Sequence, residues 1–122
     1  MTTETYFFDT YAFFEILYQN PAYHKYLHAS IITTKLNLFE LYYNLIKEYD
    51  KKTAVSILSA YSQFIVDFDI DILQEAAHLK KLFREKVSMT DAIGYMTAKK
   101  AGIKFLTGDK QFQFLPDVEF VK

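Results

Sequence analysis

The sequence predicts a single-domain α/β protein: an α/β/α sandwich around a central, mostly parallel sheet of four to five strands. Short apolar segments alternate with longer helical ones along all 122 residues, as they do in parallel sheets covered on both faces. Glycine and proline are scarce (3 and 2 residues), so short connections are expected. The length suits one hydrophobic core, so residues 1–122 are predicted to form one domain.

The individual elements follow from apolar runs and helical periodicity. The predicted strands cover residues 5–9, 30–33, 64–66, 103–107 and 118–120. Between them, helices are expected over residues 10–19, 21–28, 34–49, 51–60, 70–85 and 88–102. Asn20-Pro21 should end the first helix, and Thr34 should cap the third.

Composition excludes several classes of protein. The chain has no cysteine, so it forms no disulfide or thiolate metal site, which fits a reducing compartment. No apolar segment approaches the roughly 20 residues of a membrane helix, and the N-terminus does not read as a secretion signal, so a cytoplasmic location without a membrane partner is expected. The net charge of -1 excludes nucleic-acid binding through bulk positive charge.

Four carboxylates occupy positions that an α/β sheet could bring together. Asp9 follows the first predicted strand and Asp109 follows the strand over residues 103–107. Both therefore lie beyond carboxyl ends of parallel strands, where such sheets bind ligands. Asp91 falls in the first turn of a late helix, and Glu40 lies inside the helix over residues 34–49. If the fold gathers them, they form a site for a hard divalent cation, which points to phosphate chemistry.

Each acid also has a simpler structural explanation. Asp9 could cap the following helix, and Asp91 stands three residues after Ser88, as in a variant capping box. Asp109 could be a plain turn residue. The direction of Glu40 stays open, because its helix is apolar nearly all round.

The order of these acids resembles the PIN-domain family of metal-dependent nucleases, over essentially the whole chain. The small size of the chain is similar to that of VapC-type toxins. Two positions depart from the family pattern: Tyr11 stands where a small polar residue is common, and Gly94-Tyr95 interrupts a helix that is usually rich in alanine. The matching segments are Phe7-Phe8-Asp9-Thr10, Thr34 with Glu40, Ser88 to Ala98 with Asp91, and Thr107-Gly108-Asp109.

The resemblance implies a Mg²⁺- or Mn²⁺-dependent endoribonuclease, acting as the toxin of a type II toxin–antitoxin pair. Asp9, Asp91 and Asp109 would hold the metal, and Glu40 would complete the site or orient the attacking water. The implied partners are an RNA substrate, an antitoxin protein and a possible second copy of the chain.

Several other residues are candidates for supporting roles. Thr10 and Thr107 could orient a carboxylate or a metal-bound water, although turn or cap roles explain both residues somewhat better. Lys110, next to Asp109, is the best candidate for a contact to an RNA backbone. His24 and His28 lack further ligands and are not expected to bind zinc. The aromatic residues Tyr11, Phe14, Tyr18, Tyr23 and Tyr26 form either core or a patch for an antitoxin or a second subunit.

Other functions remain as alternatives. A housekeeping PIN nuclease would carry the same acids, and a non-catalytic α/β binding module would have the same fold. A receiver domain expects an acidic pair near the end of strand one, which is missing. A phosphoaspartate enzyme of the haloacid-dehalogenase type expects a second Asp at the position of Tyr11.

Overall fold

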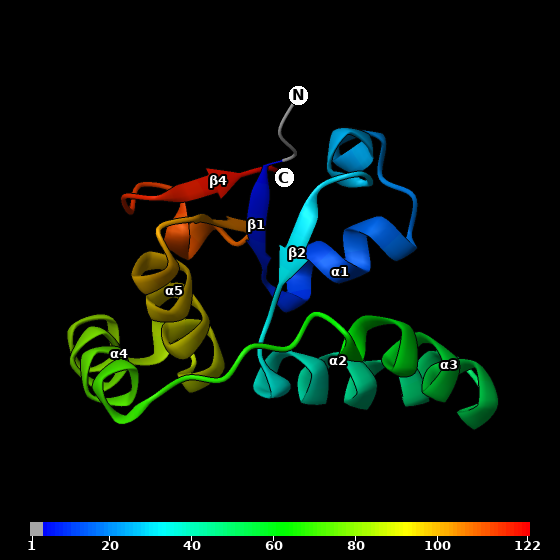
Figure 1. Ribbon diagram of the computed structural model, residues 1–122, viewed down its shortest axis with the longest axis horizontal. Helices are drawn as coiled ribbons and strands as arrows, with labels where there is room; N and C mark the ends of the chain where they lie inside the picture. The colour runs from blue at the N-terminus through cyan, green and yellow to red at the C-terminus, as the bar shows by residue number, and fades with distance from the viewer. Residues whose placement is uncertain (1–3) are drawn as a thin grey trace.

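The computed structural model describes residues 4–122, which form a four-stranded parallel sheet with helices on both faces (Figure 1). Strand β1 (Thr5–Phe8) pairs with β2 (Ser30–Ile32) on one side and with β3 (Lys104–Thr107) on the other. Strand β4 (Val118–Phe120) pairs with β3, which gives the order β2-β1-β3-β4. The predicted α/β class and parallel sheet are confirmed.

The helices begin and end close to their predicted limits. The segment expected as a helix over residues 21–28 is a 3₁₀ helix that starts at Pro21. Thr34 caps α2 as expected, because its side chain accepts a hydrogen bond from the Asn37 amide. The α-helices are α1 (Thr10–Leu17), α2 (Lys35–Glu48), α3 (Lys51–Ser62), α4 (Ile70–Phe83) and α5 (Met89–Ala101), and the 3₁₀ helices are η1 (Pro21–Tyr26), η2 (Arg84–Lys86) and η3 (Lys110–Phe112).

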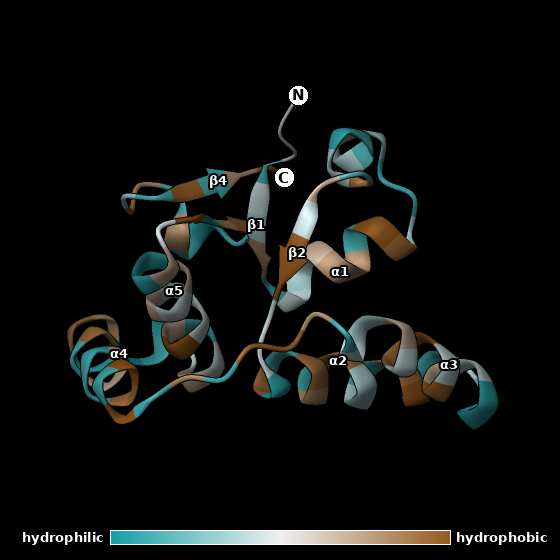
Figure 2. Ribbon diagram, viewed as in Figure 1, coloured by the Kyte–Doolittle hydropathy of each residue, from teal (hydrophilic) through white to brown (hydrophobic). Residues whose placement is uncertain are grey.

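The strand predicted over residues 64–66 is not formed. This apolar segment, brown in Figure 2, belongs to the linker between α3 and α4 and makes a single parallel bridge, from Ile65 to Thr33. The bridge does not continue beyond Thr33 toward the C-terminus, because Thr34 caps α2 immediately after it. The linker is only half-buried, so its apolar composition reflects partial packing.

Alternate residues of β1 face two separate cores. Tyr6 and Phe8 pack with α1, η1, α2 and α3, whereas Phe7 packs with α4 and α5. On the second side, Phe7 stacks on Phe105 of β3 with ring centroids 5.5 Å apart. This alternation across the strand is what a sheet buried on both faces requires.

The aromatic excess is mainly core. Tyr23 and Tyr26 of η1 are buried, and Tyr11 and Phe14 are partly buried against the same cluster. Tyr18 alone of this predicted group is exposed, at 52%. Core packing, rather than a continuous surface patch, therefore explains these residues.

The strand order creates a topological switch point at the central strand, β1. From β1 the chain crosses to β2 on one side, and it later returns to β3 on the other side. The carboxyl ends of β1 and β3 lie at this switch point, which is where open α/β sheets bind ligands. Within the described residues, no helix has the length and apolar character needed to cross a membrane.

Candidate active site at the carboxyl edge of the sheet

Asp9 lies at this switch point, directly after β1 and at the N-cap of α1. Its side chain is 3% exposed. One carboxylate oxygen accepts a hydrogen bond from the Thr10 amide at 2.8 Å, and the other accepts one from the Thr107 hydroxyl at 2.8 Å. Both donors are neutral, so the buried charge is oriented without being compensated.

Asp91 and Asp109 reach the same edge from α5 and from the end of β3. The Asp91 amide donates to the Ser88 hydroxyl at 3.1 Å, and the Asp109 amide donates to the Thr107 hydroxyl at 3.1 Å. Asp109 also caps η3. The expected capping and turn roles therefore exist, and they hold Asp91 at the start of α5 and Asp109 at the start of η3.

Glu40 faces Thr10 from α2, which settles the direction that periodicity left open. Its carboxylate is half-buried and accepts a hydrogen bond from the Thr10 hydroxyl at 3.0 Å. Thr10 thus connects two acids, since its amide donates to Asp9 and its hydroxyl donates to Glu40. Residues Thr10 and Thr107 both make the carboxylate contacts that a supporting role requires.

The four acids act on one another electrostatically. Burial raises the pKa of Asp9 well above its ordinary range, and the charge of Asp91 raises it further. Burial also raises the pKa of Asp91, with Asp109 adding to the shift. The pKa of Glu40 is raised by burial and by Asp91. These mutual effects place Asp9, Glu40, Asp91 and Asp109 in one group.

No cationic side chain offsets this group within residues 4–122. The ion pairs of the described chain join Lys25 and Lys104 to Glu119 and Lys100 to Asp69, all away from the four acids. Carboxylate oxygens are the ligands that Mg²⁺ and Mn²⁺ prefer. The donor chemistry and the uncompensated charge therefore fit a divalent cation.

The acids are not arranged as a finished set of metal ligands. Over residues 4–122, no three acidic, histidine or cysteine side chains converge closely enough to hold a metal ion. Repulsion between buried carboxylates favours such spacing, and a divalent ion would reverse the local field. The site is therefore a loosely spaced acidic group with the correct chemistry.

Two residues near the site were not recognised from the sequence. Asn37 is fully buried on α2 and contacts Thr10, and Lys122 lies beside Lys110, whose ammonium lowers the pKa of the Lys122 ammonium. A polar residue among the buried leucines of α2 was a usable signal for Asn37. Nothing in the sequence could have paired Lys110 with Lys122, because sheet pairing alone brings them together.

Tyr11, the departure noted above, packs directly on Gly108. A Cβ atom added to Gly108 would lie 2.6 Å from Tyr11 Cζ and 2.6 Å from the Val121 carbonyl oxygen. The ring therefore fills the space beside the turn between Thr107 and Asp109. Tyr11 thus packs next to the residue before Asp109 and replaces none of the four acids.

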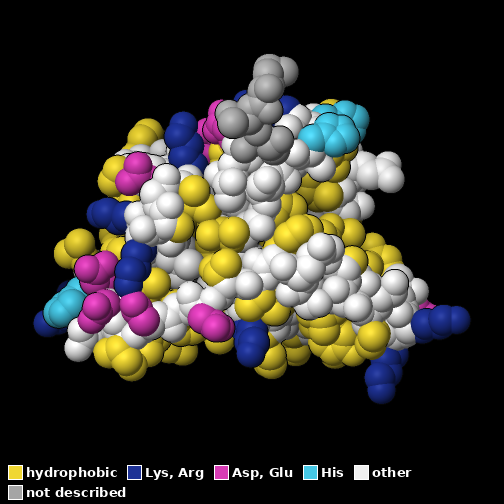
Figure 3. All heavy atoms as spheres, viewed as in Figure 1, with side chains coloured by type: hydrophobic (Ala, Val, Ile, Leu, Met, Phe, Trp, Pro, Cys, Tyr) yellow, Lys and Arg dark blue, Asp and Glu magenta, His cyan; other side chains and the backbone are white. Residues whose placement is uncertain are grey.

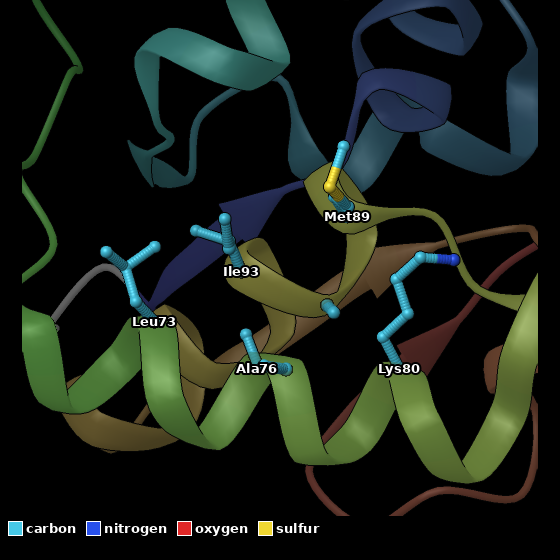
Figure 4. Close-up of a pocket in the computed structure, with 7 residues that line it drawn as sticks. Leu73, Ala76, Lys80, Met89 and Ile93 are labelled. Carbon is cyan, nitrogen blue, oxygen red and sulfur yellow. The ribbon is translucent and has the colours of Figure 1, made fainter.

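An apolar groove between α4 and α5 lies apart from this chemistry. Leu73, Ala76 and Lys80 line it from α4, and Met89 and Ile93 line it from α5 (Figure 4). None of the four acids lines this groove. The acidic group remains the candidate site.

Comparison with known proteins agrees with this geometry. The family model described as the PIN domain matches residues 6–117. The chain belongs to the PIN domain family. No curated protein sequence matches it.

Solved structures share the PIN fold at low identity. The chain is similar to a toxin–antitoxin complex from Klebsiella pneumoniae (TM-score 0.73, 20% identity, covering 93% of this chain and 94% of that one). It is also similar to VapBC2 from Rickettsia felis bound to a promoter DNA fragment (TM-score 0.71, 19% identity, covering 96% of this chain and 97% of that one). A third similar structure is that of Mycobacterium tuberculosis VapC20, a sarcin-ricin-loop-cleaving toxin (TM-score 0.71, 23% identity, covering 96% of this chain and 99% of that one). These matches show that the PIN fold spans nearly the full length of each protein.

Proposed function

We propose that this PIN domain is a divalent-metal-dependent endoribonuclease and the toxin of a type II toxin–antitoxin pair. The observation that carries the proposal is the group of Asp9, Glu40, Asp91 and Asp109, drawn from four separate elements to one edge of the sheet. Buried like charges without a cationic partner are costly. Such charges are most readily retained where a cation, bound during function, offsets their repulsion.

In this proposal, Asp9, Asp91 and Asp109 hold Mg²⁺ or Mn²⁺ directly or through water. When bound, the ion would polarise the scissile phosphate and lower the pKa of a water molecule. Thr107 keeps the Asp9 carboxylate fixed, and Thr10 holds Glu40 where it can complete the site or orient the attacking water. These two hydrogen bonds orient Asp9 and Glu40 before any cation binds.

The RNA backbone would meet positive charge at Lys110 and Lys122. Both are exposed, and neither forms an ion pair within the described chain, whose pairs use Lys25, Lys100 and Lys104. Two adjacent ammonium groups beside Asp109 favour a shared anionic partner such as a phosphate. Local charge of this kind is needed because the whole protein is nearly neutral.

An antitoxin would fit the apolar groove between α2 and α3. Leu38, Phe39 and Tyr42 of α2 line it together with Leu58 of α3, and Phe39 is 73% exposed. Hydrophobic side chains gather over this lower edge of the molecule (Figure 3). Two of the similar structures are complexes of toxins with antitoxins. A partner bound here would lie on the helix that carries Glu40, and a second copy of the chain is the competing occupant.

A cytoplasmic location belongs to the same proposal, because the chain has no cysteine.

The decisive test compares Asp9→Asn with the wild-type protein in Mn²⁺-dependent cleavage of single-stranded RNA. Removing a metal-binding charge should lower the cleavage rate at least about 100-fold while the fold is kept. Asp50→Asn is the matched control, because Asp50 also caps a helix but is exposed and remote from the acids. Equal cleavage by Asp9→Asn and wild type would reject the proposal.

Co-expression with the protein encoded beside this gene tests the toxin assignment. We expect a small DNA-binding protein to co-purify with the chain and to inhibit cleavage. Phe39→Asp should abolish the complex without affecting cleavage. Cleavage with no inhibitory neighbour would identify a housekeeping PIN nuclease instead.

A further inference from the structure

Asn37 is the polar exception on the buried face of α2. The other buried residues of that helix are Leu38, Leu41 and Leu45. A fully buried amide destabilises a fold unless its polar atoms find partners. In this protein both do, since Oδ1 accepts from the Thr34 hydroxyl at 2.7 Å and Nδ2 donates to the Thr10 hydroxyl oxygen at 3.4 Å.

The hydrogen bonds of Asn37 define which way its side-chain amide is oriented. Thr34 fixes the amide orientation, because its hydroxyl donates to Oδ1 while its oxygen accepts from the Asn37 backbone amide at 3.3 Å. The amide group of Asn37 is therefore turned toward Thr10. A hydroxyl carries a single proton, so Thr10 can accept from Asn37 and still donate to a further acceptor.

That further acceptor is Glu40. The Thr10 hydroxyl lies 3.0 Å from Glu40 Oε1 and 3.3 Å from the Asn37 carbonyl oxygen. The charged acceptor is the nearer and the stronger of the two. The hydrogen bonds thus run from Thr34 to Asn37, from Asn37 to Thr10 and from Thr10 to Glu40, and each donor strengthens the next.

We propose that Asn37 is a positioning residue of the acidic site, which acts through the Thr10 hydroxyl to fix Glu40 relative to Asp9. Thr10 is the shared element, because its amide donates to Asp9 while its hydroxyl donates to Glu40. A fixed Thr10 side chain therefore fixes the separation of two acids that come from β1 and α2. The catalytic consequence rests on the proposed nuclease function.

Loss of the Asn37 amide would free the Thr10 hydroxyl to turn toward the Asn37 carbonyl. Glu40 would then lose its neutral donor and its defined position. Supporting hydrogen bonds of this type typically change metal affinity or activity by about 10- to 100-fold. The loosely spaced acids make this site especially dependent on such support.

The experiment measures Mn²⁺ affinity by calorimetry and single-turnover cleavage of single-stranded RNA. Asn37→Asp is close to isosteric but replaces the amide donor by a carboxylate acceptor. Asn37→Ala removes the amide donor without adding charge, so the test remains available if Asn37→Asp does not fold. Thr10→Val deletes only the hydroxyl. Asn44→Ala is the control, because Asn44 lies on the same helix and donates to the Glu40 backbone carbonyl instead of its carboxylate.

We expect each Asn37 variant to weaken Mn²⁺ binding and slow cleavage at least 10-fold, and Asn44→Ala to stay within twofold of wild type. Because Asn37 acts through Thr10, combining its substitution with Thr10→Val should cause no further loss. Thr10→Ser should retain Mn²⁺ affinity near the wild-type value. These results would support the assignment.

Other outcomes overturn it. Wild-type Mn²⁺ affinity in a folded Asn37 variant would reject the role of Asn37 alone. Losses that multiply in the double variant would show that Asn37 does not act through Thr10. A wild-type protein that neither binds Mn²⁺ nor cleaves RNA would instead reject the proposed function, and the positioning role with it.

Discussion

The Thr107 hydroxyl donates a 2.8 Å hydrogen bond to the carboxylate of Asp9, which lies 98 residues earlier in the chain. Thr107 is the last residue of β3, and Asp9 directly follows the adjacent parallel strand β1. The same hydroxyl oxygen accepts from the Asp109 amide at 3.1 Å. One threonine therefore links two of the four acids, just as Thr10 links Asp9 to Glu40.

Removing this hydroxyl should affect both stability and activity. Thr107 is fully buried, so Thr107→Val keeps the shape but leaves the Asp109 amide and one Asp9 oxygen without their partner. We expect a loss of about 1–3 kcal/mol in the free energy of unfolding and a slower cleavage rate. Thr107→Ser, which retains the hydroxyl, should behave nearly as wild type in denaturant unfolding. A Thr107→Val protein as stable as wild type would contradict this account.

The stability of the metal-free protein should fall as pH rises above the ordinary pKa range of an aspartate. Burial and Asp91 raise the pKa of Asp9 in the folded state, so between the unfolded and folded pKa values the folded protein binds more protons. Stability then decreases with increasing pH in that window. Asp9→Asn should flatten the slope and raise the melting temperature at pH 7 by roughly 3–5 °C for each kcal/mol recovered.

The control for this pH effect is Asp50→Asn. The hydrogen bonds of Thr53 lower the pKa of Asp50, so its charge stabilises the folded state at neutral pH. Its replacement should not raise the melting temperature. Thermal denaturation from pH 4.5 to 7.5 in the presence of a chelator measures both effects. A melting temperature several degrees lower for Asp9→Asn would argue against crowded carboxylates.

Lys110 and Lys122 should contribute to the salt dependence of RNA binding. Each lysine that neutralises a phosphate of a single strand adds about 0.7 to the slope of log affinity against log salt concentration. In an Asp9→Asn background, which prevents cleavage, Lys110→Gln and Lys122→Gln should each reduce the slope by about that amount. Lys99→Gln, an exposed lysine at the far end of α5, should leave it unchanged. Equal salt-dependence slopes in all variants would show that Lys110 and Lys122 do not contact the RNA backbone.

Gly108→Ala should destabilise the turn between Thr107 and Asp109. The new methyl group would meet the Tyr11 ring and the Val121 carbonyl oxygen, the latter at 2.6 Å. Such overpacking costs about 1–3 kcal/mol. Tyr11→Ala in the same protein should recover only part of the loss, because the Val121 backbone cannot move away as a side chain can. Full recovery, measured by urea unfolding, would show that the ring is the sole obstacle.

Local pattern was sufficient for most of the fold and for the expectation that two of the four acids lie at one edge. Apolar runs located β1, β2, β3 and β4, and parallel strands necessarily end at one edge, which is why Asp9 and Asp109 could be placed together. The same pattern failed at residues 64–66, where an apolar segment packs as a linker. A run of three apolar residues does not reveal whether a neighbouring strand is free to pair with it.

The amino-acid order alone determined the α/β class, the parallel sheet and the candidate acids, because these follow from periodicities of two and 3.6 residues that neighbouring positions encode. Only the folded chain decided that Glu40 faces Thr10, that Asn37 supports that contact and that Lys122 lies beside Lys110. Each of these relationships joins residues on different elements. Helix and sheet packing sets such distances, and no local periodicity contains them.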